Sequence, residues 1–363
     1  MRHDTEQTVA EQAVAERIAA WQRRRLQDSG ADPFALMAEA GLFAIGLPGT
    51  NAALDSYQAI ALADHAIAAA TGELGLAMAF SARQLTARFF IGGFADQAQR
   101  EQWLPRIAAG QHWAAIAISE PGAGAHPKHL QTSAEISADG VRLRGRKAFI
   151  TNAPVADLFL VLAVVAIDDG RKRYGLFAVP RATPGLLVTP MPSLDVLAPA
   201  SHGELNFDDC LLPADARIGT LADAYPAMAL PFRDLEDTIA TSGTAGFLTW
   251  LLRLAAQRSP RGDDDALALG RLAGLLALID AASRQAVQAL DHHEPPVPAR
   301  LIGVRDLART ITAELRTMIA ATQPADSALE RKLAAFDLLA GIAREPRRLR
   351  QISLGQSLWS EPQ

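Results

Sequence analysis

Residues 119–152 read SEPGAGAHPKHLQTSAEISADGVRLRGRKAFITN, and they say more about the fold than any other stretch of the chain. The first part is a polar turn, Ser-Glu-Pro-Gly-Ala-Gly, directly after the apolar segment 113–118. The second part alternates apolar and polar residues, which predicts a strand, and Asp139-Gly140 is a hairpin signal. Hydroxyl groups stand at both predicted strand edges, on Ser119 and Thr151, where an exposed backbone can meet a flat ligand.

Composition narrows the class of protein. A chain of 363 residues is too long for one ordinary core, so we expect two or three domains. The content of 49% apolar and 21% charged residues is typical of a soluble globular protein, and the net charge of −5 gives no reason to expect nucleic acid as a partner. The single cysteine, Cys210, excludes an intramolecular disulfide.

The sequence also predicts a cytoplasmic protein that does not enter a membrane. The N-terminal segment lacks the continuous apolar core of a signal peptide. No segment reaches the roughly 18 to 20 uninterrupted apolar residues of a membrane span. A chain with one cysteine is also compatible with a reducing compartment.

Three segments with different periodicities predict an α+β fold. Residues 1–112 show apolar positions spaced by three or four and predict an N-terminal helical domain. Residues 113–222 alternate with period two and predict a central β-domain, a barrel or sandwich, with strands at 142–150, 158–166, 174–179, 186–189 and 204–207. Residues 223–363 predict a C-terminal domain like a four-helix bundle, with helices at 230–257, 266–290, 301–321 and 329–343.

These features resemble the acyl-CoA dehydrogenase family. The family pattern runs roughly T-E-P-x-A-G-S-D and then G-x-K-x-W-I-T-N, which the opening stretch follows. Segment 93–110, GFADQAQREQWLPRIAAG, is similar to the family's G-x-x-x-Q-x-x-x-x-L-P-x-x-x-x-G, and Leu329-Glu330-Arg331 with Asp337 is similar to its L-E-R-x-x-R-D helix. The order helical, β, helical is also that of the family, so the chain is identified as a divergent member.

The resemblance implies FAD as the cofactor. Fixed donors at the edge of the flavin ring stabilise the charge of its reduced form. Arg258 is implied to reach the FAD pyrophosphate of a neighbouring subunit. Phe149 replaces the usual tryptophan that stacks on the ring. The implied cofactor contacts are Ile118, Ser119, Gly124, Ala125, Phe149, Thr151 and Arg258. From the residues alone, the two hydroxyls could instead satisfy the backbone of their turns.

Other residues depart from the family or carry no site. Ala125-His126 replaces the family's Ser-Asp, and His126 is either a donor toward substrate phosphates or a solvated loop residue. Gly122 and Gly124 lack the third glycine of a dinucleotide fingerprint. His292-His293 lies in a proline-rich loop without a paired ligand motif, so we expect no metal site.

Glu236 is the predicted catalytic base. Residues 343–363 contain nothing like the family's C-terminal Y-E-G-T segment, but residues 233–237, RDLED, stand where a minority of members carry their glutamate in L-D-L-E-R. Helical spacing puts Glu236 in one apolar stripe with Phe232 and Ile239, where burial would raise the pKa of a carboxyl group. The alternative is a first-turn glutamate stabilised by the helix dipole.

The resemblance implies α,β-dehydrogenation of an acyl-CoA or of a carrier-protein thioester. Glu236 would remove the α-proton while hydride passes to flavin N5, and an electron-transfer flavoprotein would reoxidise the cofactor. It also implies a homotetramer or homodimer that acts in fatty acid or acyl-CoA metabolism. Two alternatives stay open: a catalytically silent partner subunit of a hetero-oligomer, and a flavin monooxygenase or oxidase on the same fold.

Overall fold

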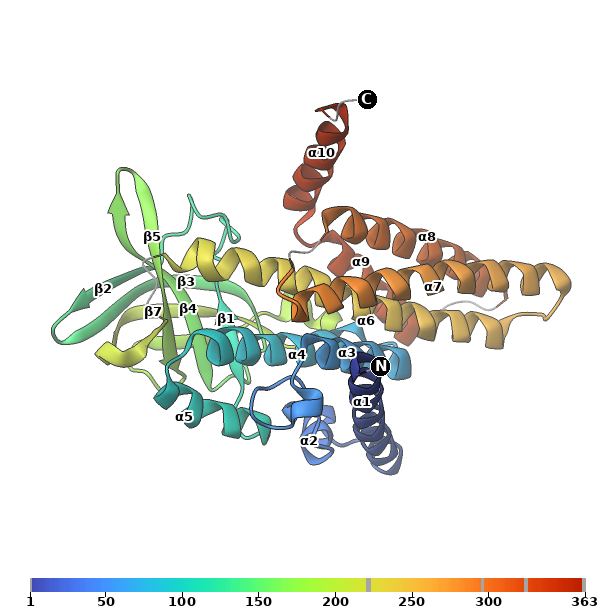
Figure 1. The fold of residues 1–363 in the computed structure, drawn as a ribbon, viewed down its shortest axis with the longest axis horizontal. Helices are drawn as coiled ribbons and strands as arrows, with labels where there is room; N and C mark the ends of the chain where they lie inside the picture. The colour runs from blue at the N-terminus through green and yellow to red at the C-terminus, as the bar shows by residue number, and fades with distance from the viewer. Residues whose placement is uncertain (1, 220–222, 295–296, 323–325, 361–363) are drawn as a thin grey trace. The chain divides into compact units, whose positions relative to one another are not determined.

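The computed structural model describes residues 2–219, 223–294, 297–322 and 326–360, with side chains from residue 9 to residue 359 (Figure 1). Its internal contacts divide the chain into two compact units. The first unit comprises Met1–Ile60 and Ala79–Glu236, and the second comprises Ala61–Met78 and Asp237–Gln363. The predicted α+β class is confirmed. The division into domains 1–112, 113–222 and 223–363 stays a prediction, and its boundary at residue 222 lies outside the described residues.

The elements follow the predicted order of helices, strands and helices. The helices are α1 (Arg2–Gln27), α2 (Pro33–Glu39), α3 (Tyr57–Thr71), α4 (Leu74–Leu85), α5 (Gln97–Ala108), α6 (Leu230–Arg258), α7 (Asp263–Asp291), α8 (Pro298–Thr322), α9 (Ser327–Gly341) and α10 (Arg344–Ser360). The strands are β1 (Ala114–Ala117), β2 (Ser133–Ser137), β3 (Gly140–Thr151), β4 (Leu158–Asp168), β5 (Arg171–Pro180), β6 (Leu186–Pro190), β7 (His202–Leu212) and β8 (Arg217–Ile218). Shorter 3₁₀ or π-helical segments lie at Leu42–Ala44, Ala52–Leu54, Thr86–Gly92, Pro192–Leu197, Ala214–Ala216 and Tyr225–Ala229.

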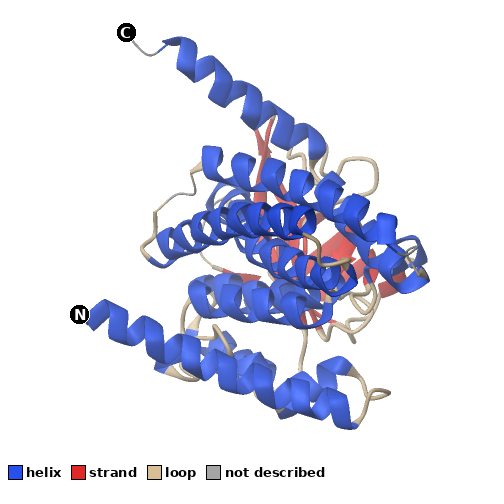
Figure 2. Ribbon diagram, turned by 90° about the vertical axis from the view of Figure 1, so that its right-hand side faces the viewer, coloured by secondary structure: helices blue, strands red, loops and turns tan. Residues whose placement is uncertain are grey.

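The strands of the first unit gather in one sheet (Figure 2). Its order is β6-β7-β3-β2-β4-β5-β8, and β1 pairs with β4 in parallel. The predicted hairpin is confirmed, because β2 and β3 pair antiparallel from Ser137 opposite Gly140. All five predicted strand segments lie within β3 to β7. Alternating apolar side chains fill one core, which includes Leu143, Ile150, Phe159, Val161, Phe177, Val179, Leu205 and Phe207.

A fully buried arginine organises the helices that precede the sheet. The Arg83 guanidinium of α4 donates to the carbonyl oxygens of Ile107 and His112 and lies against the rings of Phe43 and Trp113. Burial lowers the pKa of Arg83 to about 9. A cation in this position is tolerated because carbonyl oxygens and aromatic faces replace part of its hydration.

Helices make up the described part of the second unit, which includes α6 from Asp237 onward and α7 to α10. The four predicted C-terminal helices are confirmed as α6 to α9, and α10 follows them. The buried residues of α7 and α8 recur every three or four positions, as Leu272, Leu276 and Ile279 do in α7. Gly246 lets α6 approach α3, since a Cβ there would lie 2.2 Å from the carbonyl oxygen of His65.

Helix α7 also has the length and composition of a membrane span. An 18-residue window in it has a mean hydropathy of 1.6, and no other helix in the described residues meets the same criterion. Helix α7 also carries the charged residues Arg271 and Asp280. Asp280 pairs with His65 of the same unit at 3.7 Å.

The role of Arg83 predicts a large loss of stability for Arg83→Met. The change removes the guanidinium donor from the carbonyl oxygens of Ile107 and His112 and its contacts with two aromatic rings, so the free energy of unfolding should fall by about 3 kcal/mol. Denaturant unfolding measures it. Arg106→Met, an exposed arginine on α5, is the control and should change stability little. Equal losses in both variants would contradict the assigned role.

Candidate functional site

The structure places four of the seven predicted flavin contacts on two adjoining segments, the one that follows β1 and the end of β3. Strand β1 continues into Ile118 and Ser119, while β3 ends at Thr151. The Ala148 amide of β3 donates to the Ser119 carbonyl at 2.9 Å, which holds the two segments side by side. Ile118, Ser119, Phe149 and Thr151 therefore lie on these two adjoining segments.

A buried ion pair fastens these two segments. The Lys147 ammonium of β3 donates to Glu120 Oε1 at 2.9 Å and to the Ile118 carbonyl at 2.9 Å. Its side chain is fully buried, and that of Glu120 is 6% exposed. The Glu120 carboxylate also accepts the amides of Gln131 at 2.7 Å and Thr132 at 2.9 Å. Both charges thus have several hydrogen-bond partners in the interior.

The two pKa values reflect burial and pairing. Burial lowers the pKa of Lys147 to about 8, while Glu120 opposes that shift. For Glu120, burial alone would raise the pKa, but the Lys147 charge and the amide donors outweigh burial and lower it. The pair is therefore ionised at neutral pH, with a carboxylate that is more acidic than an ordinary glutamate.

The turn after Glu120 positions Gly124, Ala125 and His126. The amides of Glu120 and Gly124 donate to each other's carbonyl oxygens at 2.9 and 3.0 Å. The Tyr225 hydroxyl donates to the Ala125 carbonyl at 2.9 Å. His126 is exposed, with its ring 4.8 Å from that of His129. This arrangement matches the solvated loop histidine that was one of the two predicted readings.

Phe149 is a strained, exposed aromatic residue. Its φ of 61° lies in the left-handed region, and the register between β3 and β7 shifts between Lys147 and Ile150. Such a conformation is unusual for a bulky residue and costs of order 1–3 kcal/mol. The ring is 53% exposed, so it is available to a ligand. Asn152 also has a positive φ, 63°, and its side chain donates to the Ala79 carbonyl at 2.9 Å.

His202 is a site residue that the sequence did not indicate. It lies opposite Thr151 in the pairing of β3 with β7, and its Nε2 is 3.4 Å from the Thr151 hydroxyl oxygen. The residue is 7% exposed, and burial lowers the pKa of its imidazole, so the ring is neutral at pH 7. A neutral imidazole that donates from Nε2 would orient the Thr151 hydroxyl hydrogen away from itself.

The predicted burial of Glu236 is wrong. Leu235 and Ile239 are buried, whereas the Glu236 residue is exposed. In the first turns of α6 the buried line runs through Phe232, Leu235 and Ile239, and Glu236 lies at its edge where the helix is not covered. Its assignment as the base is a separate matter and stays a prediction.

Arg258, the remaining predicted cofactor contact, belongs to the second unit. Its Nη2 lies 3.9 Å from Asp326, and Asp326 caps α9 by accepting the Leu329 amide at 2.8 Å. The buried Nη1 has no hydrogen-bond partner among the described residues. A buried guanidinium donor without a partner fits an oxyanion ligand.

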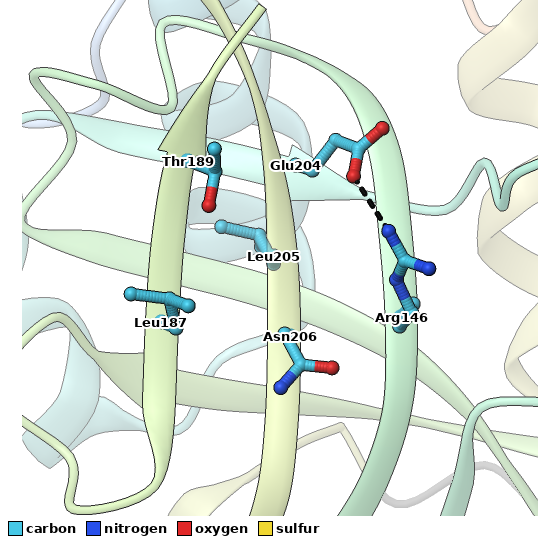
Figure 3. A pocket seen from close by; sticks show the side chains of 6 residues that line it. All are labelled: Arg146, Leu187, Thr189, Glu204, Leu205 and Asn206. Atoms are coloured by element: carbon cyan, nitrogen blue, oxygen red, sulfur yellow. Dashed lines mark hydrogen bonds and ion pairs between the residues drawn. The ribbon is translucent and has the colours of Figure 1, made fainter.

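A separate hollow of about 230 Å³ lies on the sheet where β3, β6 and β7 run side by side (Figure 3). Arg146 pairs with Glu204 at its rim at 2.8 Å. Its lining residues are Arg146, Leu187, Thr189, Glu204, Leu205 and Asn206. None of the predicted site residues lines it. Among the described residues, no group of three His, Cys, Asp or Glu side chains is placed to hold a metal ion.

Comparison with known proteins identifies the family for residues 1–111 and 115–210. The family model for the acyl-CoA dehydrogenase N-terminal domain matches residues 1–111, and that for the acyl-CoA dehydrogenase middle domain matches residues 115–210. Together they cover more than half of the chain. An L-prolyl-[peptidyl-carrier protein] dehydrogenase of Pseudomonas fluorescens is 32% identical over 210 residues, which are 57% of this chain and 55% of that protein. The chain thus spans about half the length of this relative.

Two solved structures have the same fold along nearly the whole chain. Butyryl-CoA dehydrogenase from Megasphaera elsdenii superposes with a TM-score of 0.80 at 19% identity, over 98% of this chain and 97% of that one. The FAD complex of PigA superposes with a TM-score of 0.79 at 20% identity, also over 98% and 97%. At these identities the likeness concerns the fold.

The buried ion pair predicts that removing Lys147 alone is costly. Lys147→Met leaves an uncompensated carboxylate in the interior, so the free energy of unfolding should fall by about 3–5 kcal/mol. The double variant Lys147→Met, Glu120→Leu should recover most of that loss, because neither charge remains. The control is Arg146→Gln on the same strand, whose exposed pair with Glu204 should contribute less than about 1 kcal/mol. A double variant as unstable as the single one would refute this account.

The strained backbone at Phe149 predicts that Phe149→Gly, unlike Lys147→Met, does not lower the free energy of unfolding. Glycine adopts a positive φ freely, and the released strain exceeds its extra chain entropy, so the free energy of unfolding should stay or rise by up to roughly 1 kcal/mol. Leu187→Gly in β6, which is 60% exposed without a positive φ, is the matched control and should lower it. Denaturant unfolding compares the two. A loss for Phe149→Gly as large as that for the control would show that no strain is stored there.

Proposed function

Because the chain belongs to the acyl-CoA dehydrogenase family, we propose that it is an FAD-dependent dehydrogenase that oxidises the α,β carbon–carbon bond of an acyl thioester. The observation that carries this proposal is Phe149. Its ring is exposed from a strained backbone position between the buried Lys147 and Thr151. Strain of this kind clusters at ligand sites, where the surrounding structure maintains it.

The residues present fit FAD. Phe149 offers an aromatic face to the isoalloxazine ring. The Ser119 and Thr151 hydroxyls, on the adjoining segments after β1 and at the end of β3, would contact the same ring. Arg258 would offer its unpartnered Nη1 to the FAD pyrophosphate of a neighbouring subunit. When bound, the flavin supplies the acceptor for the β-hydride of the substrate. Glu120 and Lys147 do not contact the reacting atoms in this scheme, and they hold the segments that do.

Glu236 is the proposed base for the α-proton. A base of this kind is most effective when apolar surroundings raise its pKa. Glu236 is exposed, so the proposal requires the bound thioester to cover it. Proton removal at the α-carbon and hydride departure from the β-carbon together leave a trans-2-enoyl thioester.

The substrate is proposed as an acyl-CoA or an acyl group on a carrier protein. The relative that acts on a peptidyl-carrier protein supports the second choice, and it aligns over 57% of this chain. We further propose an electron-transfer flavoprotein as the acceptor of the electrons, a homotetramer or homodimer, and a cytoplasmic location in fatty acid or acyl-CoA metabolism. These properties rest on family membership.

One observation favours a second candidate, a catalytically silent subunit that pairs with an active one. Glu236 is exposed on the first turns of α6. A chain that binds the cofactor without a positioned base would contribute structure to a hetero-oligomer. The experiment below separates this candidate from the dehydrogenase.

Anaerobic titration of the purified protein tests the proposal. We expect a yellow protein whose flavin absorbance is bleached by a saturated acyl-CoA or by an acyl-carrier protein. Glu236→Gln should abolish bleaching and retain the flavin, while Asp234→Asn on the same turn serves as the control and should still bleach.

Three outcomes count against parts of this reading. A colourless protein that cannot be reconstituted with FAD would overturn the cofactor assignment. Bleaching that survives Glu236→Gln would remove Glu236 from the mechanism. Bound flavin that neither kind of thioester bleaches would favour the silent subunit.

A further inference from the structure

Three arginines converge on one aspartate in the second unit. Asp237 lies near the start of α6, Arg305 on α8, and Arg347 and Arg350 on α10. The Nη2 atoms of Arg305 and Arg347 lie 3.1 Å from Asp237 Oδ2 and Oδ1, and the Nη1 of Arg350 lies 3.2 Å from Oδ2. Three separate helices thus supply one polar cluster, which we call the arginine cluster.

The arginine cluster is half-enclosed and positively charged. The exposed fractions of its arginine side chains are 19%, 20% and 26%, and that of Asp237 is 13%. Three guanidinium groups and one carboxylate sum to a charge of +2 over these four residues. Burial lowers the pKa of Arg305; Asp237 raises it, and both Arg347 and Arg350 lower it further. Like charges therefore repel one another inside the cluster.

Guanidinium groups in this arrangement match an oxyanion. Each presents a planar set of donors that fits a carboxylate or phosphate. The buried Nε of Arg347 has no hydrogen-bond partner among the described residues. On α10 the acidic Glu345 pairs with Arg348 at 3.1 Å, and Arg348 is not one of the three arginines of the cluster. An added anion would relieve the repulsion and would offer an acceptor to the Nε of Arg347.

We propose that Arg305, Arg347 and Arg350 bind a small oxyanion of the phosphate or carboxylate class, with Asp237 competing for the same donors. The site is distinct from the Arg258 contact proposed for the cofactor. Asp237 and Arg258 stand 21 positions apart on the continuous helix α6, a separation of roughly 30 Å along its axis. One cofactor phosphate cannot contact both ends of this helix in one subunit.

Titration of the FAD-loaded protein with inorganic phosphate tests the site. Phosphate should raise the unfolding temperature saturably above a chloride reference of equal ionic strength. Arg347→Gln should weaken phosphate binding at least about tenfold, as expected for one charge-assisted contact. Arg309→Gln is the matched control on α8, because Arg309 is exposed and pairs with Asp306, and it should bind phosphate like the unchanged protein. Parallel titration with acetate identifies the preferred oxyanion.

Asp237→Asn gives the sharper result, because it removes the competing carboxylate and keeps the shape. Phosphate should bind this variant at least about tenfold more tightly, and its stability should depend on phosphate. No saturable effect of phosphate or acetate on either protein would overturn the proposal, as would unchanged binding in Arg347→Gln. If Asp237→Asn does not fold, the comparison of Arg347→Gln with Arg309→Gln decides alone.

Discussion

The candidate flavin site depends on the buried pair of Lys147 and Glu120. Burying two charges is unfavourable unless each finds several partners, and here the ammonium has a carboxylate and a carbonyl while the carboxylate has two amides besides. The pair joins the turn after β1 to the end of β3. Ser119 stands one residue before Glu120, and Phe149 and Thr151 follow Lys147 closely. The buried pair thus fixes the backbone that carries the predicted flavin contacts Ser119, Phe149 and Thr151.

Strand pairing maintains the unusual backbone of Phe149. On one side of the bulge Lys147 is opposite Leu205, and on the other side Ile150 is opposite Gly203. Since both flanks are fixed in register, the residues between them have no extended alternative without breaking pairs. The sheet therefore supplies the energy that holds an aromatic ring at the surface, and the ring is oriented before a ligand arrives.

Periodicity and family motifs predicted what depends on local sequence. Alternation with period two predicted the strands, and apolar spacings of three or four predicted the C-terminal helices. The Asp139-Gly140 pair predicted the hairpin. Contacts between distant segments could not be read in this way. His202 reaches Thr151 only through the register of β3 with β7, across 51 residues. Glu236 fits an apolar stripe on a helical wheel, but what covers each turn of α6 depends on packing that the wheel does not contain.

Helix α6 shows how neighbouring carboxylates acquire different roles. Glu236 and Asp237 are adjacent, yet Glu236 is exposed while Asp237 is held by three arginines. Both oxygens of Asp237 already face guanidinium groups, which distinguishes this carboxylate from the exposed Glu236. In the proposed oxyanion site, the Asp237 carboxylate instead contacts donors for which an added anion would compete. On the proposed assignments, α6 would carry the base and the oxyanion site near its start. Its last residue, Arg258, would contact the cofactor of a neighbouring subunit.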